Sequence, residues 1–218
     1  MKPYQTIAEL PPVIPVFPLA GALLLPRADL PLNIFEPRYL QMFNDAIASN
    51  RLIGMIQPAH EDQRDVPALA QIGCVGRVTS FSETDDDRLL ITLTGICRFE
   101  VVEEFSVTTP YRQVEAAYHN FAADLVAETR ARSVNRDALV KAFRQYLEAN
   151  NMTANWDEVA QVSTENLVNT LSQLAPYPAA EKQALLEAPD LPARADMLIA
   201  LTELALTRNS GDRNKTLQ

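Results

Sequence analysis

The sequence predicts an α+β protein in which a β-rich part precedes a helical part. Five of the six glycines lie at or before Gly95, and ten of the fifteen prolines lie before Pro110. Neither residue type occurs from Tyr111 to Ala175. Because glycine and proline favour turns and interrupt helices, a turn-rich region followed by one without them indicates strands first and helices afterwards.

The composition is that of an ordinary globular protein and narrows the classes of partner. Of the 218 residues, 47% are hydrophobic and 22% charged, and the formal net charge is −9. An acidic surface repels phosphate backbones, so general nucleic-acid binding is disfavoured. No stretch approaches the roughly 18 apolar residues of a membrane span. The proline-containing start does not resemble a signal peptide, so we expect a cytoplasmic protein without a membrane partner.

Six apolar stretches account for the predicted β-rich part. The first, 13–19, contains Pro15 and Pro18. Because proline cannot donate a ladder hydrogen bond, we expect this stretch to be an edge strand or an extended segment. The other predicted strands or extended runs are 28–35, 51–58, 72–81, 88–105 and 111–118. The acidic stretch "SETDDD" (82–87) is predicted to be the solvated turn of a hairpin, since it lacks the spacing of a calcium loop.

The stretch "RLLITLT" predicts that the sheet closes on itself. Leu89, Ile91 and Leu93 alternate on one side of this strand, and Leu90 lies on the other. Apolar residues on both sides fit a closed or semi-closed barrel better than an open sheet. Gly95 interrupts the same strand and is a candidate bulge or bend.

One helix is predicted between the strands, and it begins in "NIFEPRYLQMF" (33–43). Pro37 suits the first helical position, where its missing N–H costs nothing. Glu36 would then lie at the positive end of the helix dipole. Apolar residues follow at helical spacing, namely Tyr39, Leu40, Phe43, Ala46 and Ile47.

Four further helices are predicted at 135–151, 163–174, 178–188 and 191–206. Asn135 is the expected cap of the first, and the Asn150-Asn151 pair its end. Ser163 or Thr164 is expected to cap the second. The expected inward positions are Leu139, Val140, Phe143, Tyr146 and Leu147 on the first helix, Leu167, Leu171 and Leu174 on the second, and Leu198, Leu201 and Ala205 on the last.

A search for catalytic and metal motifs returns little. Cys74 and Cys97 lie in apolar strand patterns, which predicts two buried, inert thiols. His60 and His119 belong to no metal-binding spacing, so no metal and no zinc site is expected. The sequence has no P-loop, no dinucleotide-binding glycine pattern and no G-x-S-x-G elbow, so we expect no cofactor.

Four polar residues remain as candidates for a site: Glu36, Arg38, Arg77 and Arg98. One interpretation is structural, with an ion pair or backbone bond that clamps the helix to the barrel. The other is a binding site built from a carboxylate and a guanidinium. A partly buried pair is costly to break by removing one partner, so structure alone would suffice to explain such residues.

Several stretches together resemble the N-terminal substrate-binding domain of Lon proteases, and in particular stand-alone bacterial proteins of that domain. The first is "IPVFPLAGALLLPRADLPLNIFEPRYLQMF" near the start of the chain. "IGCVGRVTSF", "LLITLTGICRFEVVEE" and "PYRQVEA" follow in the family's order. "PYPAAEKQALLEAPDLPARADMLIALTELAL" resembles the family's closing helices, so the resemblance covers about Pro11 to Leu206.

The resemblance implies a fold and a division of the chain. It implies a β-rich, PUA-like pseudo-barrel followed by a C-terminal helical bundle. We therefore expect a β-rich subdomain at 1–120, a helical subdomain at 121–208 and a flexible tail at 209–218. The motif-bearing residues are Glu36, Arg38, Tyr39, Arg98 and Phe99, and we expect most of them to be structural, with Tyr39 in the core.

The resemblance also implies a function without catalysis. The family's ATPase and peptidase modules are not expected here, so no catalytic residue is assigned. The expected role is a module that binds unfolded or tagged polypeptides, with a protease as a further partner. Two alternatives stay open: an RNA-binding protein, by analogy to PUA-type barrels, and an enzyme with a site built from Glu36, Arg38 or Arg98.

Overall fold

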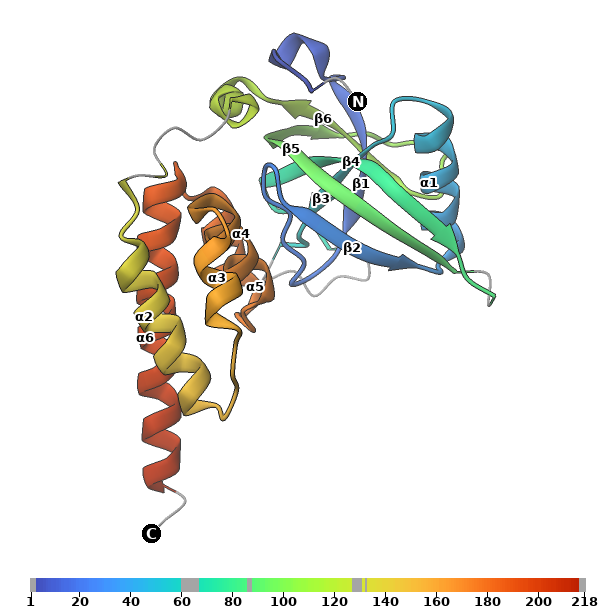
Figure 1. Cartoon of the computed structure of the whole chain (residues 1–218). Helices are drawn as coiled ribbons and strands as arrows, with labels where there is room; N and C mark the ends of the chain where they lie inside the picture. Colours follow the sequence, from blue (N-terminus) through green and yellow to red (C-terminus); the bar gives the residue numbers. More distant parts are fainter. Residues whose placement is uncertain (1–2, 60–66, 86–87, 127–130, 132, 216–218) are drawn as a thin grey trace. The chain divides into compact units, whose positions relative to one another are not determined.

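The computed structural model describes residues 3–59, 67–85, 88–126, 131 and 133–215, with the backbone alone for 209–215. The chain divides into two compact units (Figure 1). The first unit contains 1–127 together with 176–186, and the second contains 128–175 and 187–218. The first is built around a sheet and the second from helices, which confirms the predicted α+β class.

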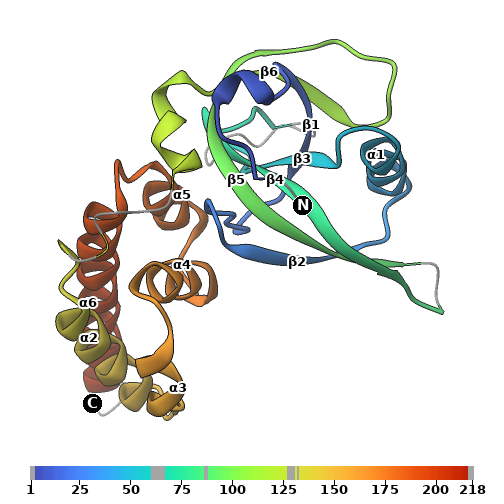
Figure 2. The ribbon, with the colours of Figure 1, turned by 45° about the horizontal axis from the view of Figure 1, so that its top comes forward.

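The first unit contains a mixed sheet that curls back on itself (Figure 2). Its described strands are β1 (Val13–Pro18), β2 (Asp29–Ile34), β3 (Leu52–Ile56), β4 (Ile72–Glu83), β5 (Leu89–Glu104) and β6 (Arg112–Ala117). They lie in the order β2-β5-β4-β3-β1-β6, and β6 also pairs with β5. Within the described chain, β2 pairs with β5 alone, so the other side of β2 is an open edge. Short 3₁₀ helices precede β1 (η1, Ile7–Glu9) and follow β6 (η2, His119–Leu125).

The first apolar stretch is extended, as predicted, but the alternative of an edge strand is wrong, because β1 lies between β3 and β6. Its first half, Val13 to Val16, pairs with β6, whereas Val16 to Pro18 pairs with β3. Pro15 therefore has a ladder neighbour on the β6 side only. The strands β3 and β6 both pair with β1 at Val16 alone, so each proline of β1 faces a paired strand on one side only. An interior strand can therefore contain proline here.

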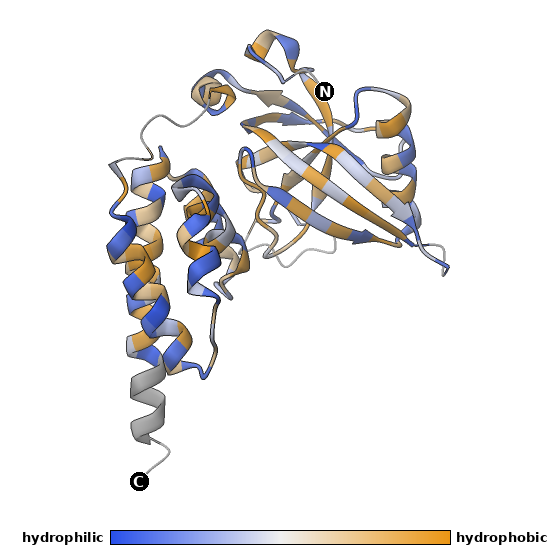
Figure 3. Cartoon of the chain, in the orientation of Figure 1, coloured by the Kyte–Doolittle hydropathy of each residue, from blue (hydrophilic) through white to orange (hydrophobic). Residues whose placement is uncertain are grey.

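Alternating side chains of β5 place the core on one side of the strand. Leu89, Ile91 and Leu93 are buried, as predicted, and hydropathy alternates along the strands in Figure 3. Leu90 is 47% exposed, so the expected burial on both sides of this strand is wrong at that position. The β4–β5 hairpin is confirmed: the Thr84 amide donates to the Arg88 carbonyl across the turn at 2.9 Å.

Gly95 marks an irregularity in β5, as predicted. The register with β4 shifts so that Val75 pairs with Cys97 but Gly76 pairs with Gly95. The Gly95 amide donates to the Ala28 carbonyl, and its carbonyl accepts from the Arg27 amide. A Cβ at this position would overlap the main-chain oxygen of Leu25, so the close approach of two backbones requires glycine.

The predicted helix start is confirmed, since α1 runs Pro37–Ala48 with Pro37 in its first turn. Glu36 is the N-cap residue, although its side chain does not bond to the helix amides. Four apolar residues of α1 are buried, namely Tyr39, Met42, Phe43 and Ala46. This face packs beside β1 and β3 (Figure 1).

The second unit contains α2 (Arg136–Ala149), α3 (Trp156–Gln161), α4 (Thr164–Leu174) and α6 (Leu191–Lys215). Asn135 and Ser163 cap α2 and α4 as predicted, by accepting from the amides of Ala138 and Asn166. The described helices α2 and α4 both pack against α6. The sequence analysis did not identify α3, which has only six residues.

Three details of the helical sequence differ from expectation. Leu174 is 76% exposed, so its predicted inward position is wrong, because it is the last residue of α4. Helix α5 (Ala179–Glu187) contributes residues through Leu186 to the first unit. Helix α6 continues to Lys215, within the segment 209–218 that we expect to be a tail. The expected domain boundaries otherwise stay predictions.

Candidate functional site

The residues of the "EPRY" stretch form a surface ion pair beside a buried ring. Arg38 Nη2 lies 2.7 Å from Glu36 Oε2, and both side chains are about half exposed. The Arg38 guanidinium carbon also lies 4.6 Å from the centroid of the Tyr39 ring. Tyr39 is buried against Phe17, with 4.1 Å between ring centroids, and burial raises the pKa of its hydroxyl.

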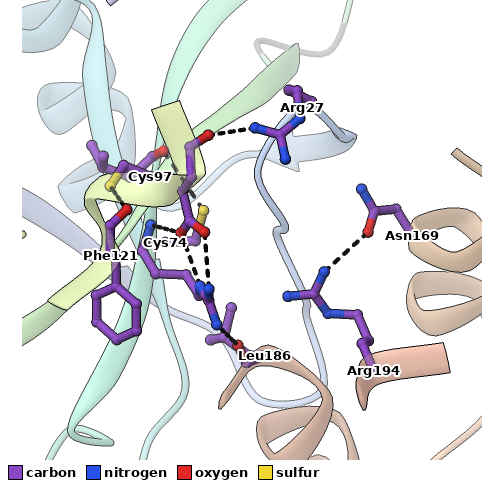
Figure 4. A network of polar contacts seen from close by, with 10 residues as sticks. Arg27, Cys74, Cys97, Phe121, Asn169, Leu186 and Arg194 are labelled. Atoms are coloured by element: carbon purple, nitrogen blue, oxygen red, sulfur yellow. Dashed lines mark hydrogen bonds and ion pairs between the residues drawn. The ribbon is translucent and has the colours of Figure 1, made fainter. Parts of the chain in front are cut away.

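Arg98 is a buried cation held in place on several sides. Its Nε and Nη2 donate to the two carboxylate oxygens of Asp124 at 2.8 and 2.9 Å, and its amide donates to Asp124 Oδ2 at 3.0 Å. Its Nη1 donates to the Leu186 carbonyl at 3.1 Å (Figure 4). Phe99, the next residue, is fully buried in the core. Asp124 was missed by the sequence analysis, because nothing near it marks the carboxylate as a partner of Arg98.

The cysteines and histidines offer little chemistry. Cys74 and Cys97 are buried free thiols, as predicted. The Cys97 thiol donates to the Phe121 carbonyl, and burial raises its pKa to about 12, so it stays protonated at neutral pH (Figure 4). His119 is exposed, whereas His60 lies outside the described residues. In the described part of the chain, no three His, Cys, Asp or Glu side chains are grouped as metal ligands.

The outer face of β2, β5 and β4 is a second candidate region, and we call it the open face. Its outward positions follow from the pairing register, in which Asn33 lies opposite Leu90 and Leu90 opposite Ser82. Hydrogen bonds link Thr79 to Thr94 and Thr94 to Asp29, at 3.0 and 2.6 Å. The open face adjoins the free edge of β2.

A groove of about 550 Å³ crosses one end of the open face. Its lining residues come from all three strands: Pro31, Leu32, Asn33, Ser80, Phe81, Ser82, Leu90, Ile91 and Thr92. Leu90 is 47% exposed on this face, and Phe35, just after β2, is 59% exposed. The Phe81 ring lies on the other side of the sheet, with its centroid 5.2 Å from that of the Phe43 ring of α1. The Arg88 guanidinium lies 5.4 Å from the Phe35 ring centroid. Exposed large apolar side chains around a groove are typical of binding surfaces.

A smaller hollow of about 280 Å³ lies beside the middle of β4 and β5. Its lining includes Arg77, which the sequence analysis singled out, together with Arg27, Tyr4 and Asp124. The Arg77 guanidinium carbon lies 4.5 Å from the Tyr4 ring centroid. We call this feature the Arg77 hollow.

The second unit has a basic hollow of about 370 Å³ between α2 and α3. Arg136, Lys141 and Arg144 line it, together with Trp156 and Asp137. The Arg144 guanidinium carbon lies 4.3 Å from the Trp156 ring centroid. This local positive charge contrasts with the net charge of −9.

Comparison with known proteins identifies the family. The family model of the ATP-dependent protease La (LON) substrate-binding domain matches residues 13–203. The chain belongs to this family. Lon protease 2 of Myxococcus xanthus is 27% identical over 200 residues, which are 88% of this chain and 24% of that protein. The Lon protease of Anaeromyxobacter dehalogenans is 26% identical over 88% of this chain and 23% of its own length. The chain thus spans about a quarter of these relatives.

Solved Lon domains share the fold. A Lon N-terminal domain protein from Xanthomonas campestris superposes with a TM-score of 0.59 at 22% identity, over 86% of this chain and 97% of that one. The N-terminal domain of the Mycobacterium avium complex Lon protease gives a TM-score of 0.64 at 17% identity, over 88% and 98%. These similarities confirm the predicted resemblance. No helix in the described part of this chain is long and apolar enough to cross a bilayer.

Proposed function

We propose that this Lon-family domain is a non-catalytic module that binds unfolded or tagged polypeptide through the open face. The observation that carries the proposal is the groove on that face, where the outward-facing Leu90 is 47% exposed. Unfolded chains expose apolar side chains, which gain free energy when such a groove covers them. A protease is a further partner in this proposal.

The free edge of β2 supports the same proposal. An edge strand has unpaired N–H and C=O groups that can pair with an extended peptide, while side-chain pockets select the sequence. Pro31 lies within β2 and limits how many donors the edge offers. We therefore expect the apolar contacts to contribute more to affinity than the main-chain pairing does.

The described geometry favours structural roles for the predicted motif residues. Glu36 and Arg38 pair with each other at the surface, whereas Arg98 is committed to Asp124 inside the first unit. A catalytic carboxylate would instead need a partner or substrate within hydrogen-bonding reach in a cleft. We also propose that the curled sheet is a PUA-like pseudo-barrel and that the second unit is a helical bundle.

Binding of a permanently unfolded protein tests the proposed function. We would titrate the whole chain into a reduced, alkylated, fluorescently labelled protein and follow anisotropy. Burying one large apolar side chain contributes about 1.5–3 kcal/mol. Leu90→Ser should therefore weaken binding by about tenfold or more.

The matched control is Val102→Ser, since Val102 is an apolar residue on β5 that is 59% exposed and does not line the groove. It should leave the affinity unchanged. Absence of binding by the unmodified chain, or an equal loss in Val102→Ser and Leu90→Ser, would contradict the proposal.

The basic hollow of the second unit favours RNA binding as a second candidate function. Arg136, Lys141 and Arg144 would contact phosphates, and the Trp156 ring offers a surface for base stacking. The Arg144→Ala/Lys141→Ala variant should then weaken binding to a single-stranded RNA and reduce the salt dependence of the affinity. No measurable RNA binding at low salt would eliminate this candidate.

A further inference from the structure

The Arg77 hollow has two guanidinium groups in its wall, although the chain is acidic overall. Arg27 and Arg77 both line it, and the third charged group in its wall is Asp124. Arg98 neutralises the Asp124 carboxylate through a bidentate ion pair. Arg27 donates to the main-chain carbonyl of Asp124. The Arg77 guanidinium lines the same hollow, and a cation there favours an anionic ligand.

Arg77 also has unused hydrogen-bonding capacity. Its Nε is buried and has no hydrogen-bond partner in the described part of the chain. The Tyr4 ring beside the guanidinium attracts its charge through the face of the ring. A buried donor without a partner costs about 1–3 kcal/mol, so a ligand that brings acceptor oxygens would recover that energy.

The chemistry of the hollow favours a carboxylate over a phosphate group. A guanidinium presents a planar fork of donors that matches the two oxygens of a carboxylate. One such fork balances the single negative charge of a carboxylate, whereas a doubly charged phosphate would need a second cation. The Thr79 and Thr94 hydroxyls in the lining bond to each other, so the preference for a carboxylate ligand rests on the Arg77 guanidinium and not on these hydroxyls.

The position and size of the hollow indicate where such a carboxylate comes from. The hollow and the groove share strands β4 and β5, with Arg77 in the middle of β4 and Ser82 near its C-terminal end. At about 3.3 Å per residue, these positions are separated by the length of a short extended peptide. A volume of about 280 Å³ is at the lower limit for small-molecule sites and suits one terminal residue. Ile96 and Leu125 supply apolar wall for its side chain.

We propose that the Arg77 hollow binds the C-terminal carboxylate of a polypeptide whose preceding residues lie along the open face, with an apolar last side chain against Ile96 and Leu125. This inference rests on the proposed polypeptide-binding function and adds the direction in which the bound chain runs. The bound chain ends at Arg77, and its upstream residues extend towards the groove.

Three labelled peptides of one unstructured sequence test the proposal with the whole chain. The first ends in leucine with a free carboxylate, the second ends in leucine amide, and the third ends in glutamate amide. Fluorescence anisotropy should show the free acid binding about tenfold more tightly than either amide. Arg77→Met should remove the difference, and Arg77→Lys, which keeps the charge without the fork, should retain only part of it.

Arg51→Met is the control, because it removes the same charge from an exposed residue that lines neither the hollow nor the groove. It should preserve the preference for the free acid. The acid-to-amide comparison on the unmodified chain needs no variant, so the proposal stays testable if Arg77→Met fails to fold.

The outcomes separate this inference from the function beneath it. Equal binding of acid and amide, together with normal binding of unfolded protein, would overturn the inference and leave the proposed function standing. Failure of every peptide and of unfolded protein to bind would overturn both. Equal affinity for the glutamate amide and the free acid would overturn the assignment to the chain terminus.

Discussion

At the scale of single residues, the sequence indicated which side chains are unusual but not what they contact. Arg98 stands out as a charged residue within an apolar strand, and its burial follows from that pattern. Its partner Asp124 lies 26 residues away in the 3₁₀ helix after β6. No local pattern predicts a pairing over that separation, because it depends on how the chain returns to the strand. For Glu36 and Arg38 the sequence suggested a clamp between helix and barrel or a binding site, whereas the two side chains pair with each other at the surface.

Breaking the buried ion pair should be costly. Arg98 and Asp124 are 5% and 8% exposed. Asp124→Ala would leave the Arg98 guanidinium buried without its carboxylate, and we expect the free energy of unfolding to fall by about 3–5 kcal/mol. Urea denaturation followed by circular dichroism measures the change.

Two further variants make that result specific to the buried charge. Glu36→Gln removes a carboxylate from the exposed pair with Arg38 and should cost at most about 1 kcal/mol. Arg98→Met/Asp124→Leu removes both buried charges and should recover much of the loss caused by Asp124→Ala. A double variant as unstable as the single one would contradict an electrostatic cause.

At the scale of elements, apolar alternation and capping residues predicted most strands and helices, since both signals are local. The α1 start at Pro37 and the Asn135 cap of α2 follow from nearby residues alone. Neighbour relations were harder to predict. The interior position of β1 depends on its pairing with both β3 and β6, which are distant in sequence. Helix α3 has six residues, too few for a helical repeat of apolar residues to be recognised.

Tyr111 shows how a single bond joins two elements and makes their contact sensitive to pH. It lies just before β6, and its hydroxyl donates to Asp45 Oδ2 of α1 at 2.7 Å. Burial, together with this bond and the charge of Asp45, raises the pKa of Tyr111 from 10.0 to about 12. Between these values the unfolded chain has released its proton while the folded protein keeps it. The stabilisation is therefore complete below pH 10 and is lost as the pH rises towards 12.

Tyr111→Phe should remove this dependence. At pH 8 the variant should lose about 1.5 kcal/mol of unfolding free energy, because a partly buried hydrogen bond to a charged group is lost. The difference from the unmodified chain should shrink as the pH is raised from 10 to 12. Urea titrations at a series of pH values measure it, and parallel curves for the two proteins across this range would refute the assignment.

At the scale of the whole molecule, the sequence placed strands before helices, and the two units follow that order except at 176–186. Composition cannot reveal which unit a helix packs with, because α5 looks like its helical neighbours in sequence. Long-range bonds decide its place within the first unit. Gln57 donates to the Ala179 carbonyl, Gln183 donates to the Ile72 carbonyl, and Arg98 donates to the Leu186 carbonyl.

The stability of the strand-built unit should therefore depend on a residue far along the chain. Leu185 of α5 is fully buried, and Leu185→Ala should cost about 2–5 kcal/mol. The single tryptophan, Trp156, lies on α3 and reports on the second unit, whereas Tyr39, Tyr111 and Tyr118 are buried in the first. In Leu185→Ala, the unfolding transition followed by near-ultraviolet circular dichroism of the tyrosines should consequently shift more than the transition followed by Trp156 fluorescence.

Two leucine variants serve as controls. Leu139→Ala, at a buried position of α2, should shift the tryptophan transition more than the tyrosine transition. Exposed Leu174 is the leucine control, whose replacement by alanine should move both transitions by no more than about 0.5 kcal/mol. A larger shift of the tryptophan signal in Leu185→Ala would assign α5 to the helical unit instead.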